Sequence, residues 1–176
     1  MKAILISILT VFFFSVYAQP SQLETIPSDY EKFVAREGSL ILTTSEEIFE
    51  TGSLDKSLTI FSVEAKDVTR TGEMLKAINV VVNKSNAYLS KEEVTRLVNQ
   101  MKKMQLLLVD GEITKKHIAT FNIRKSMLFE VTYSESKKTW KYSLGVIEND
   151  RKKLKEVTST EFQDIKVRLE DQLSKF

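Results

Sequence analysis

Two stretches of the chain repeat apolar residues at helical spacing, and each begins with a capping signal. Ser90 and Glu93 fit the reciprocal capping box, in which a hydroxyl and a carboxylate satisfy amide donors at the start of a helix. Thr158 and Glu161 fit the same box before the second stretch. Both stretches are therefore predicted to be amphipathic helices that lay one face on a sheet. The apolar positions of these faces are Val94, Leu97, Val98, Met101 and Leu108 in the first stretch and Phe162, Ile165, Leu169 and Leu173 in the second.

The residues before each predicted helix carry strand signals. Phe61 and Val63 alternate with polar neighbours, and a second apolar run covers residues 78–82 after a turn near Gly72. These runs predict two strands in the first half of the chain. Weaker strand candidates lie at 39–43 or 45–51 at the start of this half, and at 115–124 and 153–157 in the second half.

A hairpin with a buried face is predicted in the second half. If residues 134–137 form a four-residue turn, Val131 lies opposite Trp140 and Phe129 lies opposite Tyr142. We interpret Trp140 and Tyr142 as packing residues rather than as platforms for a ligand. The predicted core residues are Phe61, Val63, Phe129, Val131, Trp140 and Tyr142.

The chain aligns with itself at an offset of 68 residues. At this offset Phe61 and Val63 fall on Phe129 and Val131, and the first capping box falls on the second. We therefore expect an α+β fold of two similar units, each a set of mainly antiparallel strands that ends in an amphipathic helix. The alignment leaves open whether the two units share one sheet or one compact domain. The first unit is expected at 39–108 and the second at 109–176, after an N-terminal extension at 19–38.

The first 18 residues are interpreted as a signal peptide. Lys2 precedes an apolar run that is too short to cross a membrane as a helix, and a small-x-small motif ends at Ala18. Cleavage is expected between Ala18 and Gln19, which would release a secreted or periplasmic protein without stable membrane insertion. The chain contains no cysteine, so neither a disulfide framework nor a lipid-modified cysteine is available.

Composition excludes several kinds of chemistry. His117 is the only histidine, so the His and Cys clusters of zinc, copper, haem or iron-sulfur sites cannot be assembled. The glycines are scattered singly, so no nucleotide-binding loop can be drawn, and no cofactor is expected. The formal net charge of +2 falls to +1 when Lys2 is removed with the signal peptide, which makes nucleic acid an unexpected partner.

Two functional hypotheses follow, and they belong to different classes. The leading one is a soluble, non-catalytic exported module that binds a protein, a peptide or a component of the cell envelope. The alternative is a small hydrolase of envelope or dietary polysaccharide, since two carboxylates can hydrolyse a glycosidic bond without a cofactor. Self-association is a further expectation if the fold leaves a strand edge unpaired.

Overall fold

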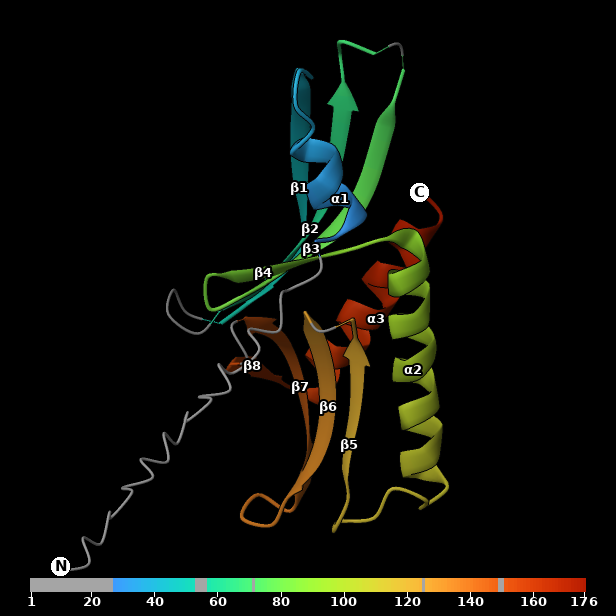
Figure 1. Ribbon diagram of the computed structural model, residues 1–176. Helices are drawn as coiled ribbons and strands as arrows, with labels where there is room; N and C mark the ends of the chain where they lie inside the picture. The colour runs from blue at the N-terminus through green and yellow to red at the C-terminus, as the bar shows by residue number, and fades with distance from the viewer. Residues whose placement is uncertain (1–26, 53–56, 71, 125, 149–150) are drawn as a thin grey trace, which may run out of the picture.

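The computed structural model describes residues 27–52, 57–70, 72–124, 126–148 and 151–176 (Figure 1). The predicted signal peptide, with Ala18 and Gln19, lies outside these residues. The elements are α1 (Asp29–Val34), β1 (Ile41–Thr51), β2 (Leu58–Asp67), β3 (Met74–Val82), β4 (Ser85–Leu89), α2 (Lys91–Val109), β5 (Ile118–Ile123), β6 (Met127–Ser134), β7 (Thr139–Glu148), β8 (Arg151–Val157) and α3 (Ser159–Leu173).

The strands form two antiparallel four-stranded sheets, in the orders β1-β2-β3-β4 and β5-β6-β7-β8. The first sheet is followed by α2 and the second by α3, which confirms the predicted α+β fold. The single long strand β1 contains the candidate at 45–51 and residues 41–43 of the candidate at 39–43. The short strand β4 was not predicted; it follows a two-residue turn at Asn83 and Lys84, whose positive φ angles suit a tight hairpin.

Both long helices begin with a complete capping box. The backbone amide of Ser90 donates to Glu93 at 2.9 Å, and the amide of Glu93 donates back to Ser90 Oγ at 3.4 Å. The corresponding distances between Thr158 and Glu161 are 2.7 and 3.2 Å. Each box satisfies two amides that the first turn of the helix leaves without a partner.

Each helix packs on the other unit as well as on its own. The helix α2 contacts β5, and α3 contacts β1, while the two helices pack against each other. The sheets meet through β3 and β4 on one side and β7 and β8 on the other. These contacts are reciprocal, as in a two-fold symmetric dimer. They merge the two units around one shared core.

The capping glutamates also join the two units. Arg124, in the turn between β5 and β6, pairs with Glu93 and donates to the backbone carbonyl of Tyr88. In the reciprocal position Thr51, at the end of β1, donates to Glu161. The same carboxylate therefore starts one helix and ties it to a strand end of the other unit.

An aromatic cluster fills the centre of the shared core. Phe162 of α3 stacks on Phe129 with 5.3 Å between ring centroids and on Tyr142 with 4.4 Å. Val131 is fully buried beside them. Trp140 is only partly buried at the edge of this cluster, where it packs edge-on against Tyr133 at 5.2 Å.

The predicted register of the second-half hairpin is wrong by two residues. Val131 pairs with Tyr142 and not with Trp140, because Ser134 still pairs with Thr139 and the turn covers residues 135–138. Since side chains alternate with period two, a shift of two residues leaves each side chain on its predicted face. The shift moves Trp140 outward along the hairpin, which explains its partial exposure.

Phe61 and Val63 do not enter the shared core. Val63 is buried in a second, smaller cluster beneath α1, and Phe61 packs against that cluster. The residues of β2 in the shared core are Leu58 and Ile60. At the offset of 68, Phe61 falls on the shared-core residue Phe129. The offset is therefore one residue out of phase in this strand, and a slip of one residue exchanges the two faces.

The loss of stability on replacing Phe162 is compared with the loss on replacing the partly buried Trp140. We expect Phe162→Ala to lower the free energy of unfolding by about 3–5 kcal/mol, because it empties the centre of the core. We expect Trp140→Ala to cost less, about 1–2 kcal/mol, because this ring already contacts solvent. Urea unfolding of both variants measures the difference, and equal losses would contradict this description of the core.

A double-mutant cycle tests the link between Arg124 and Glu93. Glu93→Gln keeps a side chain that can complete the capping box but removes the charge that Arg124 contacts. With Arg124→Met as the second change, we expect a coupling free energy of about 1 kcal/mol in unfolding experiments. Additive effects of the two changes would show that the link contributes nothing.

Candidate functional site

The first sheet extends beyond the two long helices, and its far end is uncovered on one face (Figure 1). We call this the inner face, because nearer the centre it carries Leu58, Ile60 and Val80 into the shared core. Strand alternation and register place a group of polar side chains on the same face farther out. They are Thr44 and Glu46 of β1, Ser62 and Glu64 of β2, and Lys76 of β3.

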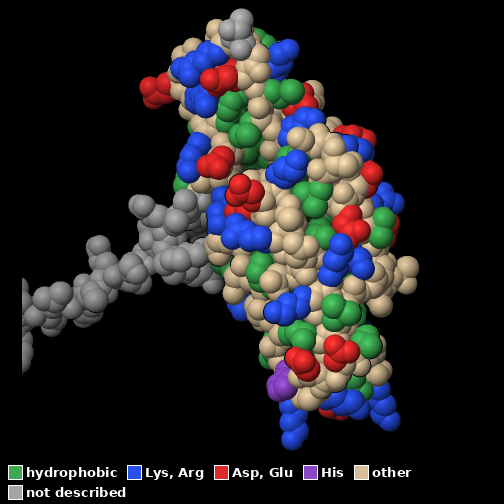
Figure 2. All heavy atoms as spheres, turned by 90° about the vertical axis from the view of Figure 1, so that its right-hand side faces the viewer, with side chains coloured by type: hydrophobic (Ala, Val, Ile, Leu, Met, Phe, Trp, Pro, Cys, Tyr) green, Lys and Arg blue, Asp and Glu red, His purple; other side chains and the backbone are tan. Residues whose placement is uncertain are grey.

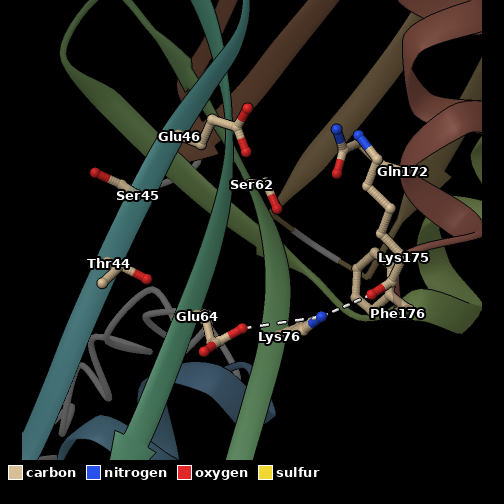
Figure 3. A pocket seen from close by; sticks show the side chains of 9 residues that line it. All are labelled: Thr44, Ser45, Glu46, Ser62, Glu64, Lys76, Gln172, Lys175 and Phe176. Carbon is tan, nitrogen blue, oxygen red and sulfur yellow. Dashed lines mark hydrogen bonds and ion pairs between the residues drawn. The ribbon is translucent and has the colours of Figure 1, made fainter.

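A groove runs from this polar surface along β1 to α3. A cavity of about 220 Å³ lies between the inner face and the end of α3 (Figure 3). In Figure 3, Gln172, Lys175 and Phe176 face the strands from the helix side. A second cavity of about 440 Å³ lies between β1 and α3 and shares Glu46, Gln172 and Lys175 with the first. We call the two together the β1 groove.

The β1 groove has an excess of negative charge. Its three cations are each engaged with a carboxylate of the groove: Lys76 with Glu64 at 3.8 Å, Arg168 with Asp164 at 2.9 Å and Lys175 with Asp171 at 3.0 Å. The other two carboxylates, Glu46 and Glu47, have no ion-pair partner among the described residues and are exposed. Counted over its described lining residues, the groove therefore carries a formal side-chain charge of −2, opposite in sign to the chain as a whole.

The edge of β1 that points away from β2 is an edge of the sheet, and only part of it is covered. Near the helix, Arg168 donates to the backbone carbonyl of Ile48 at 2.7 Å, and Thr51 donates to Glu161. An irregularity between Glu47 and Phe49 interrupts the regular ladder at the same point. From Leu42 to Glu47 every residue is exposed, and among the residues that the structure describes β1 pairs with β2 alone. This segment is an open strand edge.

One backbone hydrogen bond shows which residues of β1 direct their amide and carbonyl groups toward β2 and which direct them away from it. The amide of Val68 donates to the carbonyl of Leu40 at 3.0 Å, so this pair belongs to the hydrogen-bonded positions of the β1–β2 ladder. These positions alternate in an antiparallel ladder, so Leu42, Thr44 and Glu46 also bond to β2. The amides and carbonyls that point away from β2 are those of Ile41, Thr43, Ser45 and Glu47.

Apolar side chains lie at the far end of the inner face. Leu42 pairs with Lys66, which pairs with Met74, and Leu40 lies beside Val68. Leu40, Leu42 and Met74 are each more than half exposed. An exposed group of this kind is typical of a contact surface, whereas single exposed apolar residues are common.

A second polar cluster, Ser85 with Glu148 and Lys153, is structural. Ser85 is 2% exposed, and its hydroxyl donates to Glu148 at 2.6 Å and accepts from Lys153. Lys153 also donates to Glu148 at 2.7 Å, and these contacts lower the pKa of the Glu148 carboxyl. Because the serine is buried and both partners bind its hydroxyl, it is not presented to a substrate. The cluster joins β4 of the first unit to the β7–β8 hairpin of the second.

The residues named by sequence analysis lie away from the β1 groove. His117 is exposed, and its Nδ1 accepts the amide of Thr114 at 3.1 Å in the turn before β5. Glu93 and Glu161 serve the helix starts, while Trp140 and Tyr142 pack in the core region. Across the described ranges, no three His, Asp or Glu side chains gather as metal ligands do.

The residues missed by sequence reasoning are Glu46, Glu47 and Glu64, whose shared groove arises only from the packing of α3 on β1.

Asp67 holds the far end of the sheet in shape. Its buried carboxylate accepts the hydroxyl of Thr69, the amide of Thr69 at 2.9 Å and the amide of Arg70 at 3.3 Å. These hydrogen bonds, led by the Thr69 hydroxyl, lower the pKa of Asp67 to about 2 against the opposing effect of burial. The charged carboxylate therefore holds Thr69 and Arg70 in place, next to Val68 of the exposed apolar group.

Asp67→Asn is expected to destabilise the protein in a pH-dependent way. The folded-state pKa is below the unfolded value, so the carboxylate stabilises the fold above about pH 4, and this stabilisation is lost as pH falls toward about 2. The gap in melting temperature between the native protein and Asp67→Asn should therefore shrink over that range. Melting curves at pH 7, 4 and 2 measure it, with the exposed Asp110→Asn as the control. A gap that stayed constant would contradict the assignment.

Comparisons with protein-family models and with curated proteins identify no relative of this chain. No protein-family model matches it, and no curated protein matches it either. Its function is therefore inferred from the geometry and charge of its own surface.

Proposed function

We propose that the protein is an exported, soluble, non-catalytic binding module and that the β1 groove with the adjoining open edge is its binding surface. The observation that supports this proposal is an open strand edge beside two carboxylates, Glu46 and Glu47, that have no ion-pair partner among the described residues. An unpaired strand edge offers backbone donors and acceptors to a partner, and unpaired carboxylates offer a charge to complement. The apolar group at the far end of the inner face supplies contact area next to both.

The arrangement of carboxylates favours binding over hydrolysis. Glu46 lies opposite Ser62, and Glu64 lies opposite Thr44, so the two carboxylates are diagonal neighbours on one face of one sheet. The Cα atoms of diagonal positions are about 7–8 Å apart, so two carboxyl groups there are near enough to be compared with the pair in inverting glycosidases. Those enzymes, however, place the two groups on opposite sides of the scissile bond, whereas Glu46 and Glu64 project from the same wall. Lys76 also neutralises Glu64.

The expected compartment and partners follow from the same observations. The N-terminal signal pattern supports a secreted or periplasmic protein, and its partner would be a protein, a peptide or an envelope component. None of the helices in the described ranges is both long and apolar enough to span a membrane. On the face seen in Figure 2, basic and acidic side chains are interspersed, and such a surface gives no support to nucleic-acid binding.

A charge reversal in the groove tests the proposal. The purified chain from Gln19 onward is used to capture partners from an envelope extract and from fragmented cell-wall glycan. We expect Glu46→Lys to reduce capture of the partner by about tenfold or more, because it places a cation against the ligand's complementary charge. The matched control, Glu135→Lys, reverses an exposed charge in the β6–β7 turn and should bind like the native protein.

Two outcomes would contradict the proposal. Equal capture by the native protein and Glu46→Lys would place the binding surface elsewhere. Newly released sugar ends in the glycan sample, lost in Glu64→Gln, would establish the hydrolase alternative instead.

A further inference from the structure

We propose that the ligand of the β1 groove is an extended polypeptide segment that adds to β1 as a fifth strand of the first sheet. The segment would carry a basic residue beside Glu46 and an apolar residue beside Leu42. This inference rests on the proposed function, because it names the class of ligand for the same surface. Backbone phase, length, charge and apolar contact each constrain that ligand.

The backbone of β1 is ready to accept another strand. The outward amides and carbonyls of Ile41, Thr43, Ser45 and Glu47 repeat at every second residue, which is the spacing that a neighbouring strand requires. Natural sheets protect such edges with proline, with charged side chains, above all lysine, or with a bulge. Residues 41–47 contain neither proline nor lysine, their two charged residues are Glu46 and Glu47 at one end, and the irregularity of β1 comes only after Glu47.

The exposed edge of β1 is limited at one end, because α3 covers the strand beyond Glu47. Beyond Glu47, Arg168 occupies the carbonyl of Ile48, and α3 lies against β1. A partner strand can therefore pair with residues 41–47, about 23 Å of extended chain. At the other end of the edge, Leu40 is more than half exposed.

Charge complementarity favours a ligand with a basic residue near Glu46, at the end of the edge that α3 covers. The carboxylates of Glu46 and Glu47 are exposed there without an ion-pair partner among the described residues, while Arg168 and Lys175 are paired to aspartates. Glu46 projects onto the inner face, into the cavity of Figure 3. A lysine or arginine of the ligand that lies opposite Glu46 would enter the same cavity.

The exposed apolar side chains favour a ligand with an apolar residue beside Leu42. Leu42 lies on the same face of β1 as Glu46, four residues away, and is exposed beside Leu40 and Met74. The ligand should therefore carry an apolar residue and a basic residue four positions apart, both facing inward. Their order along the ligand depends on whether it adds in the parallel or the antiparallel direction.

A second copy of this chain fits the edge less well. Parallel pairing of two β1 edges would bring Glu46 and Glu47 of both chains side by side, and like charges in neighbouring cross-strand positions destabilise a sheet. Antiparallel pairing over residues 41–47 would instead place Glu46 of each chain opposite Leu42 of the other, where it meets no cation. A basic segment of another polypeptide instead compensates the two carboxylates of one chain.

Synthetic heptapeptides of both orders provide the first test. The probes are fluorescein-labelled Thr-Val-Thr-Thr-Thr-Lys-Thr and Thr-Lys-Thr-Thr-Thr-Val-Thr, each with a blocked C-terminus, and binding is followed by fluorescence anisotropy. We expect one of them to bind the mature protein, and replacement of its lysine by glutamate to weaken binding by about tenfold or more. No binding by either peptide, or equal binding of the glutamate version, would overturn the inference.

Backbone methylation of the peptide tests strand addition itself. In a paired strand only alternate amides point at the partner. Methylation of peptide positions 3 and 5 should abolish binding in the antiparallel arrangement and be tolerated in the parallel one, and methylation of positions 2, 4 and 6 should do the reverse. If both patterns bind, or both fail, the peptide does not add as a strand.

Ser45→Pro tests the same contact from the protein side. The amide of Ser45 points away from β2, so proline removes a donor at the edge while leaving the β1–β2 ladder intact. Loss of this hydrogen bond should weaken peptide binding by about tenfold, whereas Ser45→Ala keeps the amide and should bind like the native protein. Urea unfolding verifies that both variants fold, and the methylated peptides give a readout that needs no variant.

The outcomes separate this inference from the proposed function. If Glu46→Lys abolishes partner capture but Ser45→Pro and methylation have no effect, the groove binds its ligand without strand addition, and only the inference fails. If capture is insensitive to Glu46→Lys, the proposed function fails as well. If sedimentation shows that the protein alone forms a dimer that Ser45→Pro dissociates, the occupant of the edge is a second copy, which also overturns the inference.

Discussion

Each long helix depends on the unit to which it does not belong, and the capping glutamates enforce this dependence. Glu93 completes the first turn of α2 and pairs with Arg124 of the second unit, while Glu161 does the same for α3 with Thr51 of the first. A change in either carboxylate therefore affects a helix start and the contact between units together. These contacts add to the shared core, with Phe162 at its centre, in which both helices pack against strands of both sheets.

The candidate site is a consequence of where that packing ends. The helices cover the part of the first sheet nearest the second unit, and β1, β2 and β3 continue beyond them (Figure 1). Covered strands bury Leu58 and Ile60, whereas the uncovered continuation of the same face carries Glu46 and Glu64. The β1 groove thus combines a rigid floor with an open side. A rigid floor lowers the ordering cost of binding, because the surface is largely formed before the ligand arrives.

Local patterns predicted the elements of the fold but not their assembly. The boxes at Ser90 and Thr158 and the helical spacing after them are local signals, because their partners lie within one turn. Phe61 and Val63 were predicted as core residues, but the cluster to which they belong was not predicted, since a one-residue phase slip within β2 cannot be seen in an alternating run. The open edge of β1 could not be predicted either, because a strand's place in its sheet depends on distant partners. One signal was present: residues 43–47 read Thr-Thr-Ser-Glu-Glu, with no apolar alternation to indicate a buried face.

The reciprocal contacts of α2 and α3 have a topological consequence. The two units are joined by residues 110–117, and this connection keeps them at a high effective concentration for each other. A connection too short to let the units of one chain meet would not abolish their complementary surfaces. Each unit would then find its partner in another chain, and two chains would form a domain-swapped dimer with the same contacts. The length of this connection therefore decides whether the fold closes within one molecule or between two.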